Sequence, residues 1–241
     1  MEAFHGLIAF HLTRTNDMGK KELFNERRRP RNKRRKEYKS PHTDSFLIVT
    51  EGTKTEPNYF KGLRNQILEK THGKIDVVPV IEVRGEGKNT ESLVDAAAEL
   101  NRNADIIYQH VWVVMDKDDF PRFDQAIAKA KSMGFNVAWS NQSFEYWIYL
   151  HYYYSDVAMH RDDINKKLNQ IFKNNGVGGG KYKKEDEKIF DVVNEPPGNT
   201  MTAIANAKRR MAKFDLNQTS PSKIDPGTTV HLLVEQLLSY V

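Results

Sequence analysis

Acidic residues directly follow two strongly hydrophobic segments of the sequence. Glu51 comes after Phe46–Thr50, and Asp116 and Asp118 come after Val111–Met115. Runs of consecutive apolar and β-branched residues are typical of strands buried on both faces. In an open α/β sheet, functional side chains lie beyond the carboxyl ends of parallel strands. We therefore expect Glu51, Asp116 and Asp118 to gather at one edge of a parallel sheet.

Three carboxylates at one place repel one another unless a cation lies between them. Mg²⁺, or Mn²⁺ in its place, is the natural occupant because it prefers oxygen ligands and bridges to substrate phosphates. Such an ion polarises a phosphodiester and activates water. Asp119 is a candidate for a further ligand or for a supporting group. Acidic residues at strand ends also serve solubility and capping, but the pairing of Glu-Gly with Asp-x-Asp favours the metal site.

Three more residues are candidates for the same chemistry. Glu145 follows the predicted strand Phe135–Trp139, so it is either a metal ligand or general base or a carboxylate that complements a helix N-terminus; both alternatives stay open. Lys54 and Lys88 are candidates for phosphate binding. Lys88 lies in the glycine-containing segment 85–90, which is equally consistent with a plain flexible connection.

Aromatic residues are concentrated between positions 146 and 154. They could stack on bases, but their density on one predicted helix favours a core or a subunit interface. We interpret His151 as a packed histidine. The residues are Tyr146, Trp147, Tyr149, Tyr152, Tyr153 and Tyr154.

The hydrophobic pattern predicts alternating strands and helices as far as Trp139. Helical spacing is found in 58–70, 91–101 and 123–133, and the strands between them are predicted to form a mostly parallel four-stranded sheet with helices on both faces. Further helices are predicted over 143–154, 162–173, 199–214 and 228–240, with a flexible loop at 174–180. The predicted organisation is a basic arm (1–43), an α/β core (44–142) and a C-terminal helical extension packed on the core (143–241).

The positive charge is concentrated near the N-terminus. Of the net charge of +5, the segment 20–39 contributes +8, with 11 Lys or Arg against 3 Glu, so the rest of the chain carries −3. Such a block is either a phosphate-binding arm for nucleic acid or a solvated tail; its density favours the arm. Whether 1–17 belong to the native chain is open, since Met18 offers a second start. The arm residues are Arg27, Arg28, Arg29, Arg31, Arg34 and Arg35.

Composition and motifs exclude several classes of protein. The chain has no cysteine, which removes disulfides and thiolate metal sites and fits a cytoplasmic protein. No apolar run is long enough to cross a membrane, and the N-terminal segment lacks the basic region of a signal peptide. The glycine-rich stretch near Gly176–Lys181 is no Walker A loop, because Tyr182 occupies the position that needs Ser or Thr. We expect no ATP hydrolysis by this chain alone.

Several motifs together resemble one known family. The chain is similar to RloB-like proteins, also called the AbiLii type, of the Toprim superfamily. The resemblance rests on the basic N-terminal run and on Glu51–Phe60, Asp116–Phe120, Ser140–His151 and Thr229–Glu235. It implies a Toprim fold, dependence on Mg²⁺, and a role in bacterial antiphage defence beside an AAA- or ABC-type ATPase.

Two hypotheses of different classes follow. The first is a metal-dependent phosphodiesterase that cleaves RNA or DNA, with Glu51, Asp116, Asp118 and Glu145 in the catalytic site. The second is a non-catalytic nucleic-acid-binding or sensor subunit that works with an ATPase partner. Nucleotidyl transfer ranks last because no tyrosine is placed persuasively as a covalent nucleophile. The sequence does not decide between RNA and DNA, and it leaves a homo-oligomer open.

Overall fold

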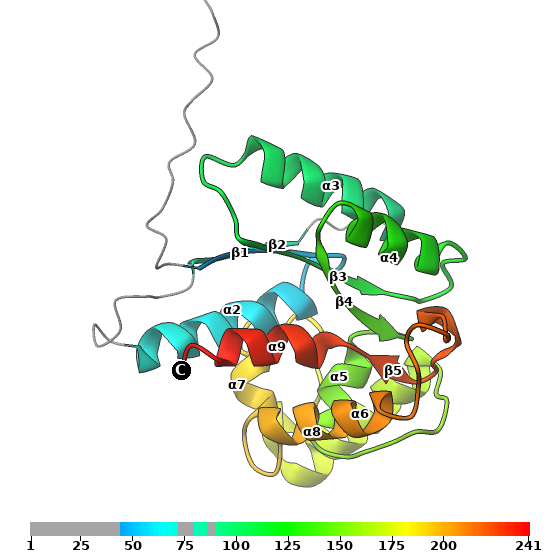
Figure 1. Cartoon of the computed structure of the whole chain (residues 1–241). Coiled ribbons are helices and arrows are strands. Elements are labelled where there is room, and N and C mark those ends of the chain that lie inside the picture. Colours follow the sequence, from blue (N-terminus) through cyan, green and yellow to red (C-terminus); the bar gives the residue numbers. More distant parts are fainter. Residues whose placement is uncertain (1–43, 72–79, 86–89) are drawn as a thin grey trace, which may run out of the picture. The chain divides into compact units, whose positions relative to one another are not determined.

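The computed structural model describes residues 44–71, 80–85 and 90–241. A mixed sheet forms its centre, with the strand order β2-β1-β3-β4-β5 (Figure 1). The first four strands in this order are parallel, and β5 is antiparallel to β4. The predicted α/β fold with a mostly parallel sheet is confirmed. The strands are β1 (Ser45–Thr50), β2 (Val80–Gly85), β3 (His110–Asp116), β4 (Asn136–Asn141) and β5 (Gly227–Thr228).

The short fifth strand was not predicted. It is held beside β4 by Thr229, whose amide donates to the Trp139 carbonyl at 2.8 Å and whose hydroxyl accepts from the Trp139 amide at 3.0 Å. Two residues are too few to give a strand its alternating pattern. This contact nevertheless ties the C-terminal part of the chain to the sheet.

Helices cover both faces of the sheet, as predicted. Side chains alternate along β1, so Phe46 and Ile48 enter one hydrophobic cluster while Leu47 and Val49 enter the other. Figure 1 shows α3 and α4 on one face and α2 and α9 on the opposite face. Their bounds are α2 (Thr55–Lys70), α3 (Thr90–Asn103), α4 (Phe123–Ser132) and α9 (Val230–Leu238).

The segment after β4 is mainly helical and packs on the α2 face. Buried residues of its helices belong to the same hydrophobic cluster as Phe46, Tyr59 and Phe60. The first helix ends at Leu150, earlier than predicted, and the helix at 189–193 was not predicted. The predicted loop 174–180 contains a 3₁₀ turn at Val177–Gly180. The α-helices are α5 (Glu145–Leu150), α6 (Arg161–Asn175), α7 (Ile189–Val193) and α8 (Thr200–Met211).

The connections create a topological switch point between β1 and β3. The chain leaves β1 toward β2 on one side of the sheet, and it leaves β3 toward β4 on the other side. In parallel sheets, a crevice opens at the carboxyl ends of the two strands where the direction of winding changes. Glu51 and Asp116 stand at these two strand ends.

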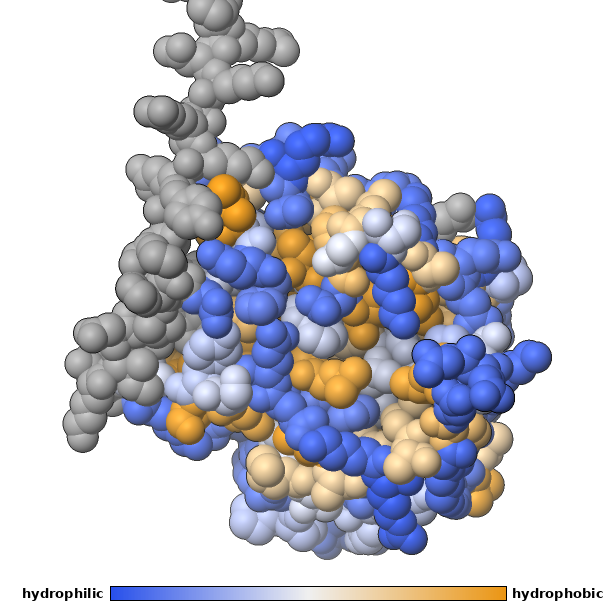
Figure 2. Space-filling view, in the orientation of Figure 1, coloured by the Kyte–Doolittle hydropathy of each residue, from blue (hydrophilic) through white to orange (hydrophobic). Residues whose placement is uncertain are grey.

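The surface of the described residues is mixed in polarity. On the face shown in Figure 2, hydrophilic side chains alternate with small hydrophobic areas. Within the described ranges, no helix is long and apolar enough to cross a membrane.

Candidate active site

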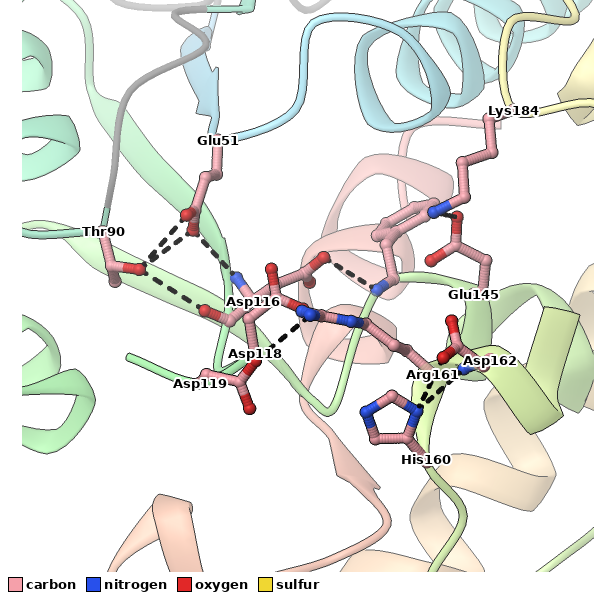
Figure 3. Close-up of polar contacts among 11 residues, drawn as sticks. Glu51, Thr90, Asp116, Asp118, Asp119, Glu145, His160, Arg161, Asp162 and Lys184 are labelled. Atoms are coloured by element: carbon pink, nitrogen blue, oxygen red, sulfur yellow. Dashed lines mark hydrogen bonds and ion pairs between the residues drawn. The ribbon is translucent and has the colours of Figure 1, made fainter. Parts of the chain in front are cut away.

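Glu51 and Asp116 are in direct contact across the switch point. The backbone amide of Asp116 donates to Glu51 Oε2 at 3.2 Å, and the Thr90 hydroxyl donates to the same oxygen at 3.1 Å (Figure 3). The contact arises because the Glu51 amide continues the β1–β3 ladder by donating to Val114 O at 3.0 Å. Burial raises the pKa of Glu51 to about 7, although the bonds from Asp116 and Thr90 lower it in part. The side chain is therefore poised to exchange a proton near neutral pH.

Asp116 has one hydrogen-bonded and one unpartnered carboxylate oxygen among the described residues. Its Oδ2 accepts a bond from the Phe144 amide at 3.0 Å. Its Oδ1 is buried and has no hydrogen-bond partner among the described residues. Burial raises the pKa of Asp116 well above its usual range, and repulsion from Glu56 and Glu145 adds to the effect. An unsatisfied buried oxygen among other carboxylates is costly without a proton or a cation.

Glu56 is a member of this cluster that the sequence analysis did not select. It lies in the first turn of α2 and is only 7% exposed. Its carboxylate lies over Gly52, where a Cβ atom would come within 2.1 Å of Glu56 Oε2. Burial raises the pKa of Glu56 to about 7, and repulsion from Glu145 and Glu51 contributes. Because Gly52 has no side chain, the Glu56 carboxylate occupies the space beside it and lies near Glu51.

Glu145 begins α5 and has two partners from the segment after α6. Its Oε1 lies 2.9 Å from Lys184 Nζ and accepts from the Tyr182 hydroxyl at 3.2 Å. The Glu145 side chain is 4% exposed, whereas that of Lys184 is 54% exposed. Thr55 at the start of α2 donates to the Lys184 carbonyl at 2.8 Å, which fixes the lysine backbone beside the cluster. Lys184 therefore supplies a positive charge to a mostly acidic site.

Asp118 and Asp119, the other two acidic residues of the motifs, form ion pairs with Arg161. Asp118 Oδ1 lies 2.7 Å from Arg161 Nη1, and Asp119 Oδ2 lies 3.1 Å from Arg161 Nη2. Asp118 has a φ of 40°, and its amide donates to Gln142 O at 3.0 Å. With Asp118 held in this way, no group of three or more acidic or histidine side chains within the described part of the chain is arranged to hold a metal ion.

A cleft of about 430 Å³ brings most of these residues together. Lys54, a predicted phosphate-binding residue, lines this cleft in addition to the acidic cluster. Lys88 and the six arginines of the predicted arm lie outside the described residues. The cleft is lined by 52–56, Asp116, Asp118, 143–145, Arg161, Lys184 and Glu185.

The aromatic residues of 146–154 lie mostly in the core. Tyr146, Trp147 and Tyr149 are buried, whereas Tyr153 is exposed. His151 is completely buried, with Nδ1 3.0 Å from the Trp147 carbonyl and Nε2 3.1 Å from the Tyr59 hydroxyl. Burial lowers the pKa of His151 to about 4. A neutral packed histidine agrees with these contacts.

The donors at the switch point are of the chemical type that hard divalent cations prefer, although no three acidic side chains of the described residues converge on one point. All are carboxylate oxygens, which suit Mg²⁺ and Mn²⁺, and the buried Oδ1 of Asp116 lacks another partner within the described ranges. To hold such an ion, Asp116, Glu51 and Glu56 would have to converge from the positions described, and Asp118 would have to give up its pairing with Arg161.

Comparison with known proteins gives one match. The family model described as "RloB-like protein" matches residues 46–237. The chain belongs to the RloB-like protein family. No curated protein and no solved structure matches it. The matched residues of this RloB-like protein run from β1 to α9 and include every described residue of the cleft.

Sequence reasoning missed four of the charged residues that this RloB-like chain brings into the cleft, namely Glu56, Arg161, Lys184 and Glu185. Glu56 has the sequence context of an ordinary first-turn carboxylate, and only its spacing from Glu51 across Gly52 could have pointed to it. Arg161 and Lys184 lie in the helical extension, far from the motifs in sequence. No local pattern identifies them, because tertiary packing alone brings them to the sheet edge.

Proposed function

We propose that this RloB-like protein is a Mg²⁺-dependent nuclease of the Toprim type that hydrolyses phosphodiester bonds in RNA or DNA. The observation that carries the proposal is the contact between Glu51 and Asp116 at the switch point. Within the described ranges, a buried oxygen of Asp116 has no partner there, and two further buried glutamates lie beside it. Binding sites in parallel sheets lie at this position. Carboxylates with raised pKa values in a cleft are typical of catalytic centres.

The charged residues of the cleft, together with Glu51 beside it, divide into two roles under this proposal. Asp116, Glu51, Glu56 and Asp118 hold the ion, and when bound it polarises the phosphodiester and activates water. Alternatively, Glu51 acts as general acid or base for the attacking water instead of as a ligand of the ion.

Positive residues at the rim would orient the substrate. Lys54 and Lys184 line the cleft and neutralise phosphate oxygens. The basic segment 27–35 supplies affinity that does not depend on sequence.

The direct test is cleavage of labelled RNA and DNA oligonucleotides by the purified chain, with Mg²⁺, Mn²⁺ or EDTA. We expect metal-dependent products that disappear in Asp116→Asn and Glu51→Gln. Asp95→Asn is a suitable control, because Asp95 is a half-exposed partner of Lys129 on the opposite face of the sheet from α2. Cleavage at the wild-type rate by either site variant would overturn the proposed roles.

A second candidate function is favoured by the pairing of Arg161 with Asp118 and Asp119. A permanent ion pair there would leave the site without a full set of ligands, as expected of a nucleic-acid-binding or sensor subunit without activity. Binding that weakens steeply with salt, with no cleavage under any metal, would support this function over the nuclease.

We further propose that the nuclease acts in antiphage defence together with an ATPase partner. This proposal rests on the resemblance to the RloB branch of the Toprim superfamily. Its test is protection of bacteria from phage by the chain expressed with and without a neighbouring ATPase gene, compared with the Asp116→Asn variant. Equal protection by that variant would show that defence does not depend on cleavage.

A further inference from the structure

Arg161 forms an unusual bridge at the rim of the cleft. It is the first residue of α6, and its guanidinium reaches Asp118 with Nη1 and Asp119 with Nη2, at 2.7 and 3.1 Å. Figure 3 shows this side chain extending from α6 toward the Asp116–Asp118 segment. A planar guanidinium binds two acceptors in fixed geometry, and it binds phosphate oxygens in the same way.

This bridge competes with a metal ion for one carboxylate. Asp118 belongs to the predicted ligand set, yet its charge is already paired with Arg161. A divalent cation close to Asp118 would also repel the guanidinium, because both carry positive charge. Metal binding and the Arg161 bridge therefore oppose each other.

The bridge is weak enough to be exchanged. The side chains of Arg161 and Asp118 are 35% and 44% exposed, and that of Asp119 is 84% exposed. Ion pairs in such settings are screened by water and salt and contribute little net stability. The backbone of Asp118 is nevertheless anchored by its amide bond to Gln142 O at 3.0 Å. The carboxylate can thus change partners while its backbone remains in place.

We propose that Arg161 is a substrate-binding residue that exchanges partners during the reaction. Before metal binding it neutralises Asp118; when the ion takes Asp118, the released guanidinium binds a phosphate group of the nucleic acid. The proposal rests on the proposed nuclease function. It is supported by the place of Arg161 in the wall of the same cleft as Asp116, Lys54 and Lys184. Arg161 thereby couples occupation of the metal site to capture of the substrate.

Direct metal binding tests the first half of the proposal without any need for activity. Mn²⁺ titration of the full chain, followed by calorimetry or by the paramagnetic resonance of free Mn²⁺, should give a Kd about three- to tenfold lower for Arg161→Gln than for wild type. Lys166→Gln is the matched control, because Lys166 lies on the same helix in an exposed pair with Asp163. Asp116→Asn should lose the binding.

The outcomes separate the exchange from the nuclease. An unchanged Kd in Arg161→Gln, with binding lost in Asp116→Asn, would overturn the exchange and leave the metal site intact. If the folded wild type and Arg161→Gln both fail to bind Mn²⁺, the metal-dependent function fails and the exchange fails with it.

Steady-state cleavage tests the second half. At saturating metal, Arg161→Gln should raise KM for the oligonucleotide by about tenfold. Arg161→Lys should recover part of this loss, because lysine keeps the positive charge but lacks the planar guanidinium that binds two oxygens. If Arg161 had only a structural role, its substitution would not both tighten metal binding and weaken substrate binding. A wild-type KM in Arg161→Gln would overturn the phosphate contact.

Discussion

Glu51 Oε2 accepts a hydrogen bond from the backbone amide of Asp116 at 3.2 Å. This bond joins the residue after β1 to the last residue of β3, so the two acidic motifs share one rigid base in the sheet. The Thr90 hydroxyl at the start of α3 completes the arrangement by donating to both Glu51 oxygens, at 3.1 and 3.3 Å. Three elements of the fold therefore fix one carboxylate and its protonation equilibrium.

Removal of the Thr90 hydroxyl should shift the pH dependence of cleavage. Thr90 stabilises the ionised form of Glu51 and so lowers its pKa; Thr90→Val keeps the shape but should raise that pKa. If the ionised form is active, the acidic limb of the kcat/KM profile moves to higher pH. Rates measured from pH 5.5 to 9 check this, with Thr202→Val on the exposed side of α8 as control. An unchanged acidic limb would show that the ionisation of Glu51 does not control the rate of cleavage.

Asp116→Asn should separate stability from function. In the protein without metal, the buried carboxylate lies near three other acidic side chains, so its replacement by a neutral amide should stabilise the fold by about 1 kcal/mol, or about 2–4 °C in Tm. Mn²⁺ should raise the Tm of the wild type through binding to the folded state but leave Asp116→Asn unchanged. Thermal unfolding in EDTA and in Mn²⁺ measures both effects. A large loss of stability in EDTA would show instead that the carboxylate holds the sheet edge together.

Sequence reasoning succeeded with the fold where the pattern was long and repetitive. The alternation of buried strands and amphipathic helices from β1 to β4 predicted the parallel sheet, because each element contains enough residues to show its period. The strand β5 was not predicted, because its pairing depends on the contact of Thr229 with Trp139 and not on its own two residues.

The candidate site was predicted only in part for a related reason. Glu51 and Asp116 follow hydrophobic strands, and the topology of a parallel sheet then places them at one edge. Arg161 and Lys184 reach the cleft through the packing of the helical segment on α2 and α5, which no local pattern encodes. Glu56 differs from a common helix-capping carboxylate only by its burial over Gly52.

Protonation of Glu56 should make the stability of the metal-free protein depend on pH. Its carboxyl has a pKa of about 7 in the folded state, against about 4.5 for a glutamate exposed to water. The folded state thus binds more protons between these values, and stability falls as pH rises from about 4.5 to about 7. Urea unfolding in EDTA should show that this fall is smaller, by on the order of 2 kcal/mol, in Glu56→Gln. Parallel curves for the two proteins would show that Glu56 ionises normally.

Gly52→Ala should displace Glu56 without a change of charge. The added methyl group would lie 2.1 Å from Glu56 Oε2, so the carboxylate must rotate away from its place in the cluster. We expect cleavage to fall at least tenfold and Mn²⁺ binding to weaken, with stability reduced by about 1 kcal/mol or less because only the end of one side chain moves. Thr202→Ala, at an exposed position of α8 that does not line the cleft, is the control. Full activity in Gly52→Ala would remove Glu56 from the working site.

Lys184 should support both the stability and the activity of the cluster, and a double substitution distinguishes the two contributions. Lys184→Ala leaves the buried Glu145 carboxylate with the Tyr182 hydroxyl as its remaining partner in the described structure, at a cost of about 1–2 kcal/mol. Lys183→Ala, at an exposed neighbouring position, should cost almost nothing.

The double variant Lys184→Ala/Glu145→Gln should recover most of the lost stability, because the unpaired charge is gone. Cleavage should stay low in the double variant, since the phosphate-binding charge at the rim is still missing. Urea unfolding and cleavage rates for the four proteins of this cycle measure both effects. Recovery of activity together with stability would mean that Lys184 acts only by neutralising the charge of Glu145.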